Sequence, residues 1–292
     1  MHSRKLIVTH HAPDLDAISA TWILKKFHAQ DFADAKIAFI NAGNTITLDE
    51  AEQHGSQLHE VTHLDTGLGE FDHHQPDKAK QGNITSSSLV YDHVCKVHPE
   101  LKDDKALKIM IDFINEIDHF REIDWPEPAS YKYIFMIHEL INGHEYTEPH
   151  DDDSQMHFGM QCLDYAYAAL KQRVKAEEII TSKGIEFEIK AGKCLAIATR
   201  NHSTMKLAQK KGFVLVLTKD PERGHLRVKV RPDADFDLSK LHQRIQKADR
   251  VGTWFYHGGG KMLLNGSDRN RDQKPSPLTL EQMIELIQEI YV

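Results

Sequence analysis

The sequence of 292 residues contains little cysteine and no long hydrophobic run. Its three cysteines, Cys95, Cys162 and Cys194, are far apart and form no CxxC pair, which excludes a disulfide framework and indicates free thiols in a reducing compartment. The longest apolar stretches are far shorter than the ~20 residues of a membrane-spanning helix. Residues 1–5 run straight into a strand, without the apolar segment and cleavage site of a secretory signal. These absences predict a cytoplasmic protein with no membrane partner.

The sequence also lacks an excess of positive charge, because its formal net charge is −8. This balance argues against a general nucleic-acid coat protein. The charge is unevenly distributed: residues 185–292 carry 19 basic and 13 acidic residues, whereas residues 1–184 carry 17 basic and 31 acidic residues. The acidic part could hold cations and the basic part an anionic substrate. Uneven surface charge that serves only solubility is the alternative.

The first half of the chain alternates apolar runs with helical patterns, which predicts an α/β fold with a parallel sheet covered by helices on both faces. The expected strands are Lys5–Thr9, Lys36–Ile40 and Glu60–Asp65, and the expected helices are Asp14–His28, Leu48–Leu58, Thr85–His98, Asp104–Asp124 and Tyr131–Gly143. The predicted domains are a metal-binding domain over residues 1–150, a linking helix over 151–184 and a smaller α/β substrate-binding domain over 185–292. The last domain should contain strands at 185–190, 194–199, 213–218 and 226–231, and helices at 238–247 and 278–290.

Histidine and aspartate side chains follow two of the predicted strands. His10, Asp14 and Asp16 come after the first strand, and Asp65 and the triplet Asp72-His73-His74 come after the third. The carboxyl ends of parallel strands meet at one edge of a sheet, where functional groups gather. Neutral imidazoles and ionised carboxylates suit Mn, Co, Zn or Fe, and so dense a set of ligands indicates two ions. His63 shares the sheet face of Asp65 and is a candidate partner, although most of the 20 histidines should be structural or solvated.

These motifs, together with Asp118, resemble those of the DHH phosphoesterase superfamily, which includes RecJ-type exonucleases, oligoribonucleases, cyclic-dinucleotide phosphodiesterases and manganese pyrophosphatases. The resemblance covers residues 5–125 and keeps the family's order of four motifs: HxxxDxD, a strand-end Asp, DHH and a helical Asp. The stretch Glu70–Gln75 also resembles the DHHQ signature of the melanocyte-proliferating-gene exonuclease family. The first motif of that family differs from the one in this sequence.

The resemblance implies two divalent ions, manganese first, with Mg, Co or Zn as alternatives. One ion would be held by His10, Asp14 and Asp65, and the other by Asp16, Asp65, His73 and Asp118. The implied reaction is attack on a phosphoryl group by a hydroxide that the two ions share. The implied catalytic residues are Asp65, which bridges the ions, His74, which contacts the phosphoryl oxygen, and Asp72, which orients a neighbouring imidazole.

A glycine-rich stretch in the second half is the candidate substrate loop. Glycine lets backbone N–H groups approach an anion, so His257, Gly258, Gly259 and Lys261 are expected to bind substrate, with Asn265 and Ser267 behind them. DHH phosphoesterases often carry a similar Gly/His-rich loop in a C-terminal domain. His11 could contact substrate beside the metals, although an exposed histidine without a ligand is the simpler interpretation.

The sequence therefore predicts a metal-dependent phosphohydrolase that acts on phosphodiester or phosphomonoester bonds. The expected partner is a small anionic phosphate ester, a nucleotide or a short single-stranded oligonucleotide. One alternative is a pyrophosphatase or polyphosphatase that uses the same metal site. Others are a regulator that binds metal or nucleotide without catalysis, and a protein with a structural or interaction role. The oligomeric state stays open, with a dimer as one possibility.

Overall fold

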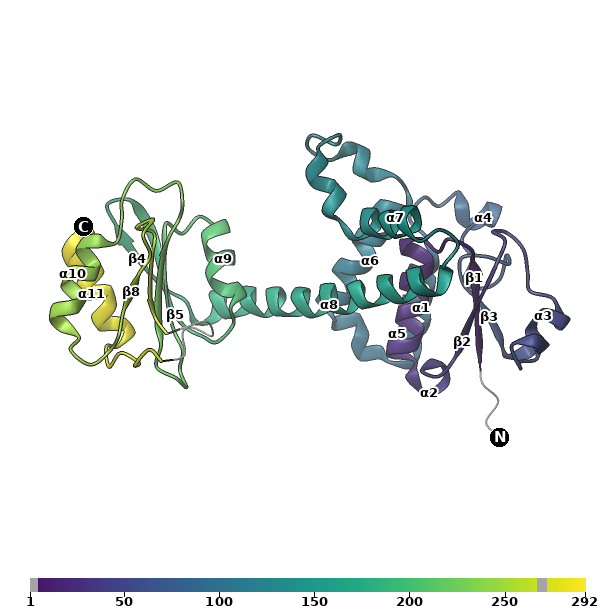
Figure 1. Cartoon of the computed structure of the whole chain (residues 1–292), viewed down its shortest axis with the longest axis horizontal. Coiled ribbons are helices and arrows are strands. Elements are labelled where there is room, and N and C mark those ends of the chain that lie inside the picture. The colour runs from purple at the N-terminus through teal and green to yellow at the C-terminus, as the bar shows by residue number, and fades with distance from the viewer. Residues whose placement is uncertain (1–4, 267–271) are drawn as a thin grey trace. The chain divides into compact units, whose positions relative to one another are not determined.

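The structure is a computed structural model that describes residues 5–266 and 272–292, and Ser267 lies outside these residues. The chain forms two compact units, Met1–Ala169 and Leu170–Val292. The division falls inside one helix of 32 residues, α8 (Asp152–Lys183), so that this helix contributes to both units (Figure 1). Within the described ranges, no helix is both long and apolar enough to cross a membrane.

The first unit is built on a parallel sheet with the strand order β2-β1-β3. The strands are β1 (Leu6–His10), β2 (Lys36–Ile40) and β3 (Val61–His63). Leu6, Ile7 and Val8 are fully buried, so that both faces of β1 are covered. Figure 1 shows α1 and α5 on one side of the sheet and α3 on the other. The predicted α/β class with a parallel sheet is confirmed.

Local signals set the first helix. Asp14 is its N-cap and accepts a hydrogen bond from the Ala17 N–H at 3.0 Å, as the sequence predicts. The other helices and 3₁₀ turns of this unit are α2 (Ala29–Phe32), α3 (Leu48–Gln53), η1 (Leu58–Glu60), α4 (Pro76–Ala79), α5 (Ser86–Val97), η2 (Pro99–Asp103), α6 (Lys105–Asp118), η3 (Arg121–Asp124), η4 (Tyr131–Phe135) and α7 (Ile137–Thr147).

Two predicted helices are shorter in the structure. The helix expected over residues 104–124 ends at Asp118, because Phe120 adopts a left-handed backbone with φ of 54° and turns the chain. The helix expected over 48–58 ends at Gln53, shortly before Gly55, whose φ is 79°. Residues 119–136 form the upper projection of this unit in Figure 1 and α7 lies below them, and together they make up segment 119–147. It exposes several large apolar side chains: Phe120, Ile123, Tyr131, Ile134, Phe135, Leu140 and Tyr146.

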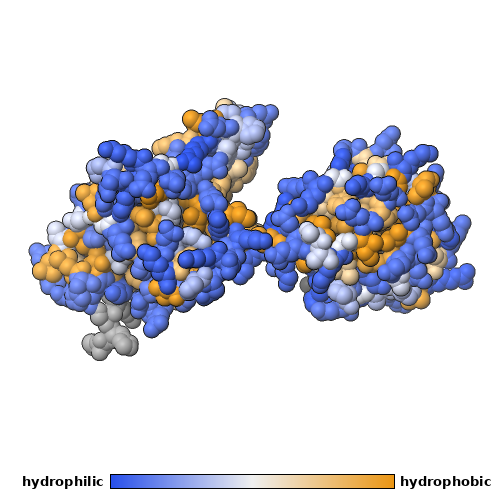
Figure 2. Space-filling view, turned by 180° about the vertical axis from the view of Figure 1, so that it is seen from behind, coloured by the Kyte–Doolittle hydropathy of each residue, from blue (hydrophilic) through white to orange (hydrophobic). Residues whose placement is uncertain are grey.

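The second unit contains a mixed sheet with the strand order β4-β5-β6-β7-β9-β8, in which β5 and β6 are the parallel neighbours among the described strands. Helices α10 and α11 cover one face, and α9 with the end of α8 covers the other. Figure 2 shows that hydrophilic residues dominate the visible face of this unit and surround smaller hydrophobic patches. Its elements are β4 (Ile185–Ile189), β5 (Gly192–Ala198), α9 (Ser203–Lys210), β6 (Leu215–Lys219), β7 (Leu226–Val230), α10 (Ser239–Ala248), β8 (Phe255–Tyr256), β9 (Met262–Asn265) and α11 (Leu280–Tyr291).

Candidate metal centre

Parallel pairing brings His10 and Asp65 together. Val8 of β1 lies opposite His63 of β3, and two further residues along each chain place His10 beside Asp65. The His10 Nε2 lies 3.4 Å from Asp65 Oδ2 and 4.0 Å from Asp14 Oδ1. The Asp65 side chain is only 2% exposed. The carboxyl edge of the sheet therefore carries one imidazole and two carboxylates from the first two motifs.

Asp16 lies on the first turn of α1 and contacts another helix. Its two oxygens accept hydrogen bonds from the first backbone N–H groups of α5, those of Ser86 at 2.7 Å and Ser87 at 2.9 Å. The side chain is 1% exposed. Helix N-termini favour negative charge, so α5 holds the Asp16 carboxylate at the edge of the cluster while each oxygen keeps a second lone pair.

The Asp72-His73-His74 turn is organised by its aspartate, which is fully buried. Asp72 accepts hydrogen bonds from the Leu68 N–H at 2.7 Å and from the His74 N–H at 3.0 Å. Its Oδ1 also lies 2.8 Å from Nδ1 of His74, so the imidazole that Asp72 orients is that of His74. The neighbouring His73 projects into the cluster, with its Nε2 3.2 Å from Asp65 Oδ1.

The structure brings all the predicted metal ligands into three overlapping groups: His10, Asp14 and Asp65; Asp16, His73 and Asp118; and Asp65, His73 and His74. The candidate ligand atoms within each group lie within 4.8 Å of one another. Asp65 and His73 each belong to two groups, which links the three into one cluster. Asp118, at the end of α6, approaches His73 Nε2 at 3.8 Å, and Asp16 approaches it at 3.9 Å.

The donor atoms of this cluster fit divalent ions. Oδ1 of Asp65 and Nε2 of His73 are buried, and neither has a hydrogen-bond partner in the described part of the chain. Orphaned buried polar atoms are costly unless an ion or another group satisfies them. Ligand atoms about 2.1 Å from one ion lie about 3.0–3.4 Å from one another in octahedral or tetrahedral geometry. The observed separations of 3.2–4.0 Å are close to this range. In the described residues, the ion pairs of these aspartates all involve imidazoles.

The pKa values of these groups reflect their mutual charges. Burial alone would lower the pKa of His10 and of His73, but the adjacent Asp65 carboxylate and further aspartates raise each to about 9. Burial would raise the pKa of Asp65, but His10 and His73 hold it well below its usual range. Burial and the charges of Asp65 and Asp118 raise the pKa of Asp16 far above its usual value. The cluster thus stores unfavourable carboxylate charge, which cations would relieve.

Backbone strain is concentrated at the same place. Six residues other than glycine adopt a left-handed backbone in the described ranges: Ala12, Asp65, Leu68, Phe120, Glu127 and His150. One of them is Asp65 itself, and three others, Ala12, Leu68 and Phe120, lie within, between or beside the cluster motifs in sequence. A left-handed backbone costs a residue with a side chain about 1–2 kcal/mol and is retained where the surroundings enforce it. Such strain is typical of functional sites.

The predicted substrate residues have other contacts. His11 is 55% exposed, and its Nδ1 lies 2.6 Å from Asp152 Oδ2. The predicted loop is a tight connection between β8 and β9, two strands that the sequence pattern did not reveal, and the His257 N–H donates to the Met262 carbonyl at 3.0 Å. Gly258 and Gly259 are exposed in this turn. The Lys261 ammonium donates to two backbone carbonyls, those of Ala234 and Phe236, each at 2.6 Å.

Two further predicted partners are structural. Asn265 is fully buried, and its amide donates to the Thr253 and Lys274 carbonyls while its oxygen accepts from the Ser276 N–H. His63 accepts the Ile46 N–H at 3.1 Å through Nε2, which ties it to the loop before α3. Neither contact serves the metal cluster.

Two residues that support the cluster, Lys78 and Asp152, were not anticipated from the sequence. Lys78 donates to the backbone carbonyls of Gly69, Glu70 and Asp72, and so holds the loop before the DHH turn. The His119 ring lies 6.3 Å from that of His73, between centroids, and Asp152 contacts the loop after β1. The adjacency of His119 to Asp118 was visible in the sequence. No local signal connects Asp152 to a loop 140 residues away.

No family model and no curated protein matches the chain. Among solved structures, it is similar to a DHH-domain member of the s1p family of ribosomal proteins (14% identity, TM-score 0.33), covering 98% of this chain and 86% of the other. It is also similar to CDC45 from Entamoeba histolytica, with 11% identity and a TM-score of 0.30, over 98% of this chain and 95% of the other. A third similar structure is RecJ from Thermus thermophilus in complex with Mg²⁺, with 12% identity and a TM-score of 0.31. The similarity covers 98% of this chain and 49% of the RecJ chain.

Proposed function

We propose that this protein is a metal-dependent phosphoesterase of the DHH type. The observation that carries the proposal concerns two buried atoms, Asp65 Oδ1 and His73 Nε2, which lie 3.2 Å apart and have no hydrogen-bond partner among the described residues. Around them lie the other proposed ligands, His10, Asp14, Asp16 and Asp118. These ligands come from four separate segments of the chain. A buried cluster of this composition stabilises neither a core nor a surface unless it binds cations.

Two sets of residues would hold the ions. His10, Asp14 and Asp65 form one set, and Asp16, His73 and Asp118 form the other, with Asp65 close enough to His73 to serve both. Divalent ions there, manganese first, would supply Lewis-acid chemistry and stabilise negative charge on a phosphoryl group. The mixed nitrogen and oxygen donors favour Mn, Co or Zn over Ca.

His74 has a separate role beside the ions. Its hydrogen bond with Asp72 raises the pKa of His74 above the ordinary value, which favours the protonated imidazole. The bond engages Nδ1 and leaves Nε2 for a ligand, and the side chain is 60% exposed. A fixed, protonated imidazole can donate a hydrogen bond to a phosphoryl oxygen and stabilise the charge that develops there. Asp72 thus acts by orienting His74.

The proposed substrate is a small phosphate ester, such as a nucleotide or a short single-stranded oligonucleotide. The excess of basic residues in 185–292 supports an anionic ligand. The sequence has no long run of basic residues of the kind that would bind an extended nucleic-acid duplex. Candidate contacts for this substrate are His11, which is exposed beside the proposed ligand His10, and the turn that contains His257, Gly258, Gly259 and Lys261. We expect cytoplasmic activity.

The decisive experiment is a manganese-dependent activity panel. It compares labelled di- to pentanucleotides, bis(p-nitrophenyl) phosphate, cyclic dinucleotides and pyrophosphate, using wild type, Asp65→Asn and the control Asp112→Asn. Asp112 is exposed on α6, outside the cluster, so its variant should retain activity. Cleavage of a phosphoester by wild type, and its loss in Asp65→Asn alone, would support the proposal. Release of phosphate from pyrophosphate alone would identify a pyrophosphatase instead. Equal rates for wild type and Asp65→Asn would falsify the assignment.

A further inference from the structure

Three successive aspartates, Asp151, Asp152 and Asp153, precede or open α8, and the structure gives each a different environment. Asp151 caps the helix, since its Oδ1 accepts the Ser154 N–H at 3.0 Å. Asp153 is exposed. Asp152, with a side chain only 12% exposed, turns to the loop between β1 and α1, which carries the first metal-binding motif.

The contacts of Asp152 hold that loop at its most strained residue. Its Oδ1 accepts the Ala12 N–H at 2.7 Å, and its Oδ2 lies 2.6 Å from Nδ1 of His11. Ala12 has a φ of 48°, a left-handed backbone that is unfavourable for any residue with a Cβ atom. One turn further along α8, the buried Gln155 donates to the Pro13 carbonyl at 3.0 Å. Three consecutive loop residues are therefore held by two side chains of one helix.

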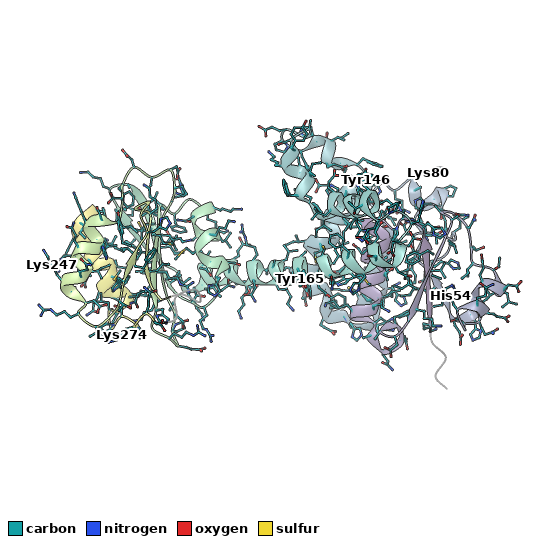
Figure 3. All side chains as sticks on the ribbon, viewed as in Figure 1. His54, Lys80, Tyr146, Tyr165, Lys247 and Lys274 are labelled. Carbon is teal, nitrogen blue, oxygen red and sulfur yellow. The ribbon has the colours of Figure 1, made fainter. Side chains whose placement is uncertain are left out.

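The position of α8 on this unit does not depend on these contacts. Gly159 packs so closely against Ile18 of α1 that a Cβ atom would come within 2.7 Å of its side chain. Further along, Asp164 accepts the Trp22 indole N–H at 3.0 Å, and Tyr167 donates to Asp104. Tyr165, on the exposed side of the helix, projects away from it (Figure 3). Because the helix is fixed independently, it can set the position of the loop.

We propose that the first turn of α8 is a clamp, formed by Asp152 and Gln155, which positions His10 and Asp14 for metal binding. This inference rests on the metal site proposed above. Asp152 and Gln155 are positioning residues: they act on the backbone between the two ligands and need not touch an ion. Partners that orient metal ligands typically contribute about 10- to 100-fold to metal affinity.

Titration of Mn²⁺ into the metal-free chain, followed by the electron paramagnetic resonance of free Mn²⁺, tests the clamp without any substrate. Asp152→Ala should weaken Mn²⁺ binding about 10- to 100-fold at a temperature where it is fully folded. Asp152→Asn keeps one oxygen for the Ala12 N–H and should lose less. Asp153→Ala, the matched control, should bind as wild type does.

A second substitution separates positioning from general stability. Glycine adopts a left-handed backbone freely, so Ala12→Gly should restore part of the affinity lost in Asp152→Ala. Amide hydrogen exchange at residue 12, measured without metal, should be faster in Asp152→Ala than in wild type or Asp153→Ala. Wild-type affinity in Asp152→Ala, or unchanged exchange at residue 12, would overturn the clamp. Normal metal binding by wild type without turnover of any phosphoester would reject the enzymatic proposal and leave the clamp standing.

Discussion

Replacing Asp118 by asparagine should stabilise the metal-free protein while weakening its metal binding. The Asp118 side chain is 13% exposed, and its Oδ2 lies 3.8 Å from His73 Nε2 and 3.6 Å from His119 Nδ1. Burial raises its pKa, His73 opposes this rise, and Asp14 and Asp65 add to it, so that the pKa reaches about 6. Asparagine keeps the size of the side chain and removes its charge.

The magnitude follows from proton linkage. The folded carboxyl keeps its proton up to about pH 6, whereas the ordinary value is 3.8. The folded state thus binds more protons than the unfolded state between these pH values, and the free energy of unfolding falls as pH rises through this window. The difference between these two pKa values corresponds to about 3 kcal/mol at most. Asp118→Asn should therefore match wild type near pH 4 and exceed its stability by up to ~3 kcal/mol at pH 7.

The assay is a urea titration in EDTA, read by pulsed amide exchange of peptides that contain β1, which report the first unit. Asp112→Asn, on the exposed side of the same helix, is the matched control and should change stability by less than ~0.5 kcal/mol. With saturating Mn²⁺ the order should reverse, because wild type gains more from the ion than a variant that lacks one ligand. A variant that is less stable than wild type at pH 7 in EDTA, or a difference that does not vary with pH, would refute the reasoning.

Three further predictions concern other groups. Asp16→Ala should lower the free energy of unfolding of the metal-free chain by about 2–5 kcal/mol, because the buried Ser86 and Ser87 N–H groups lose their acceptor. Chemical denaturation should show a smaller decrease for Asp16→Asn, which keeps one acceptor oxygen. Binding of Mn²⁺ should release protons, because imidazoles that bind a metal must be neutral. Burial lowers the pKa of His10 and His73, but the Asp65 carboxylate has the larger effect, and both pKa values rise to about 9. The affinity should thus rise between pH 6.5 and 9, with released protons counted by calorimetry in two buffers, and a pH-independent affinity would contradict this. Lys261→Met should lower the melting temperature, because two backbone carbonyls lose their donor; a raised KM at unchanged stability would instead assign Lys261 to the substrate.

The sequence predicted well where the signals were local. The apolar run of β1, the Asp14 cap and the periodicity of α1 lie within 25 residues of one another, and all appear as expected. Burial on both faces of β1 favours parallel pairing, and the observed register places His10 beside Asp65. The meeting of the four motifs at one edge of the sheet could therefore be anticipated from strand order and ligand type alone.

Prediction failed where local preference was overridden. Residues 119–124 continue the apolar pattern of α6, yet Phe120 breaks the helix with a left-handed backbone that no propensity favours. The short strands β8 and β9 were not predicted, because the glycines between them indicate a loop. The Ala234 and Phe236 carbonyls that accept from Lys261 lie 27 and 25 residues away in the chain, so no local signal pointed to them.

These failures and the metal cluster have a common physical origin. Asp65 has a left-handed backbone, and so do Ala12, which lies within the first motif, and Phe120, which follows the last motif. Asp16 and Asp118 are buried with raised pKa values among like charges. The left-handed backbones and the buried carboxylates are each unfavourable locally, so predictions based on neighbouring residues miss all of them. They persist together only if something outside the local sequence offsets their cost. Divalent cations bound as proposed would offset the charge, and distant side chains such as Asp152 and Lys78 hold the strained loops, so the places where sequence rules fail coincide with the candidate site.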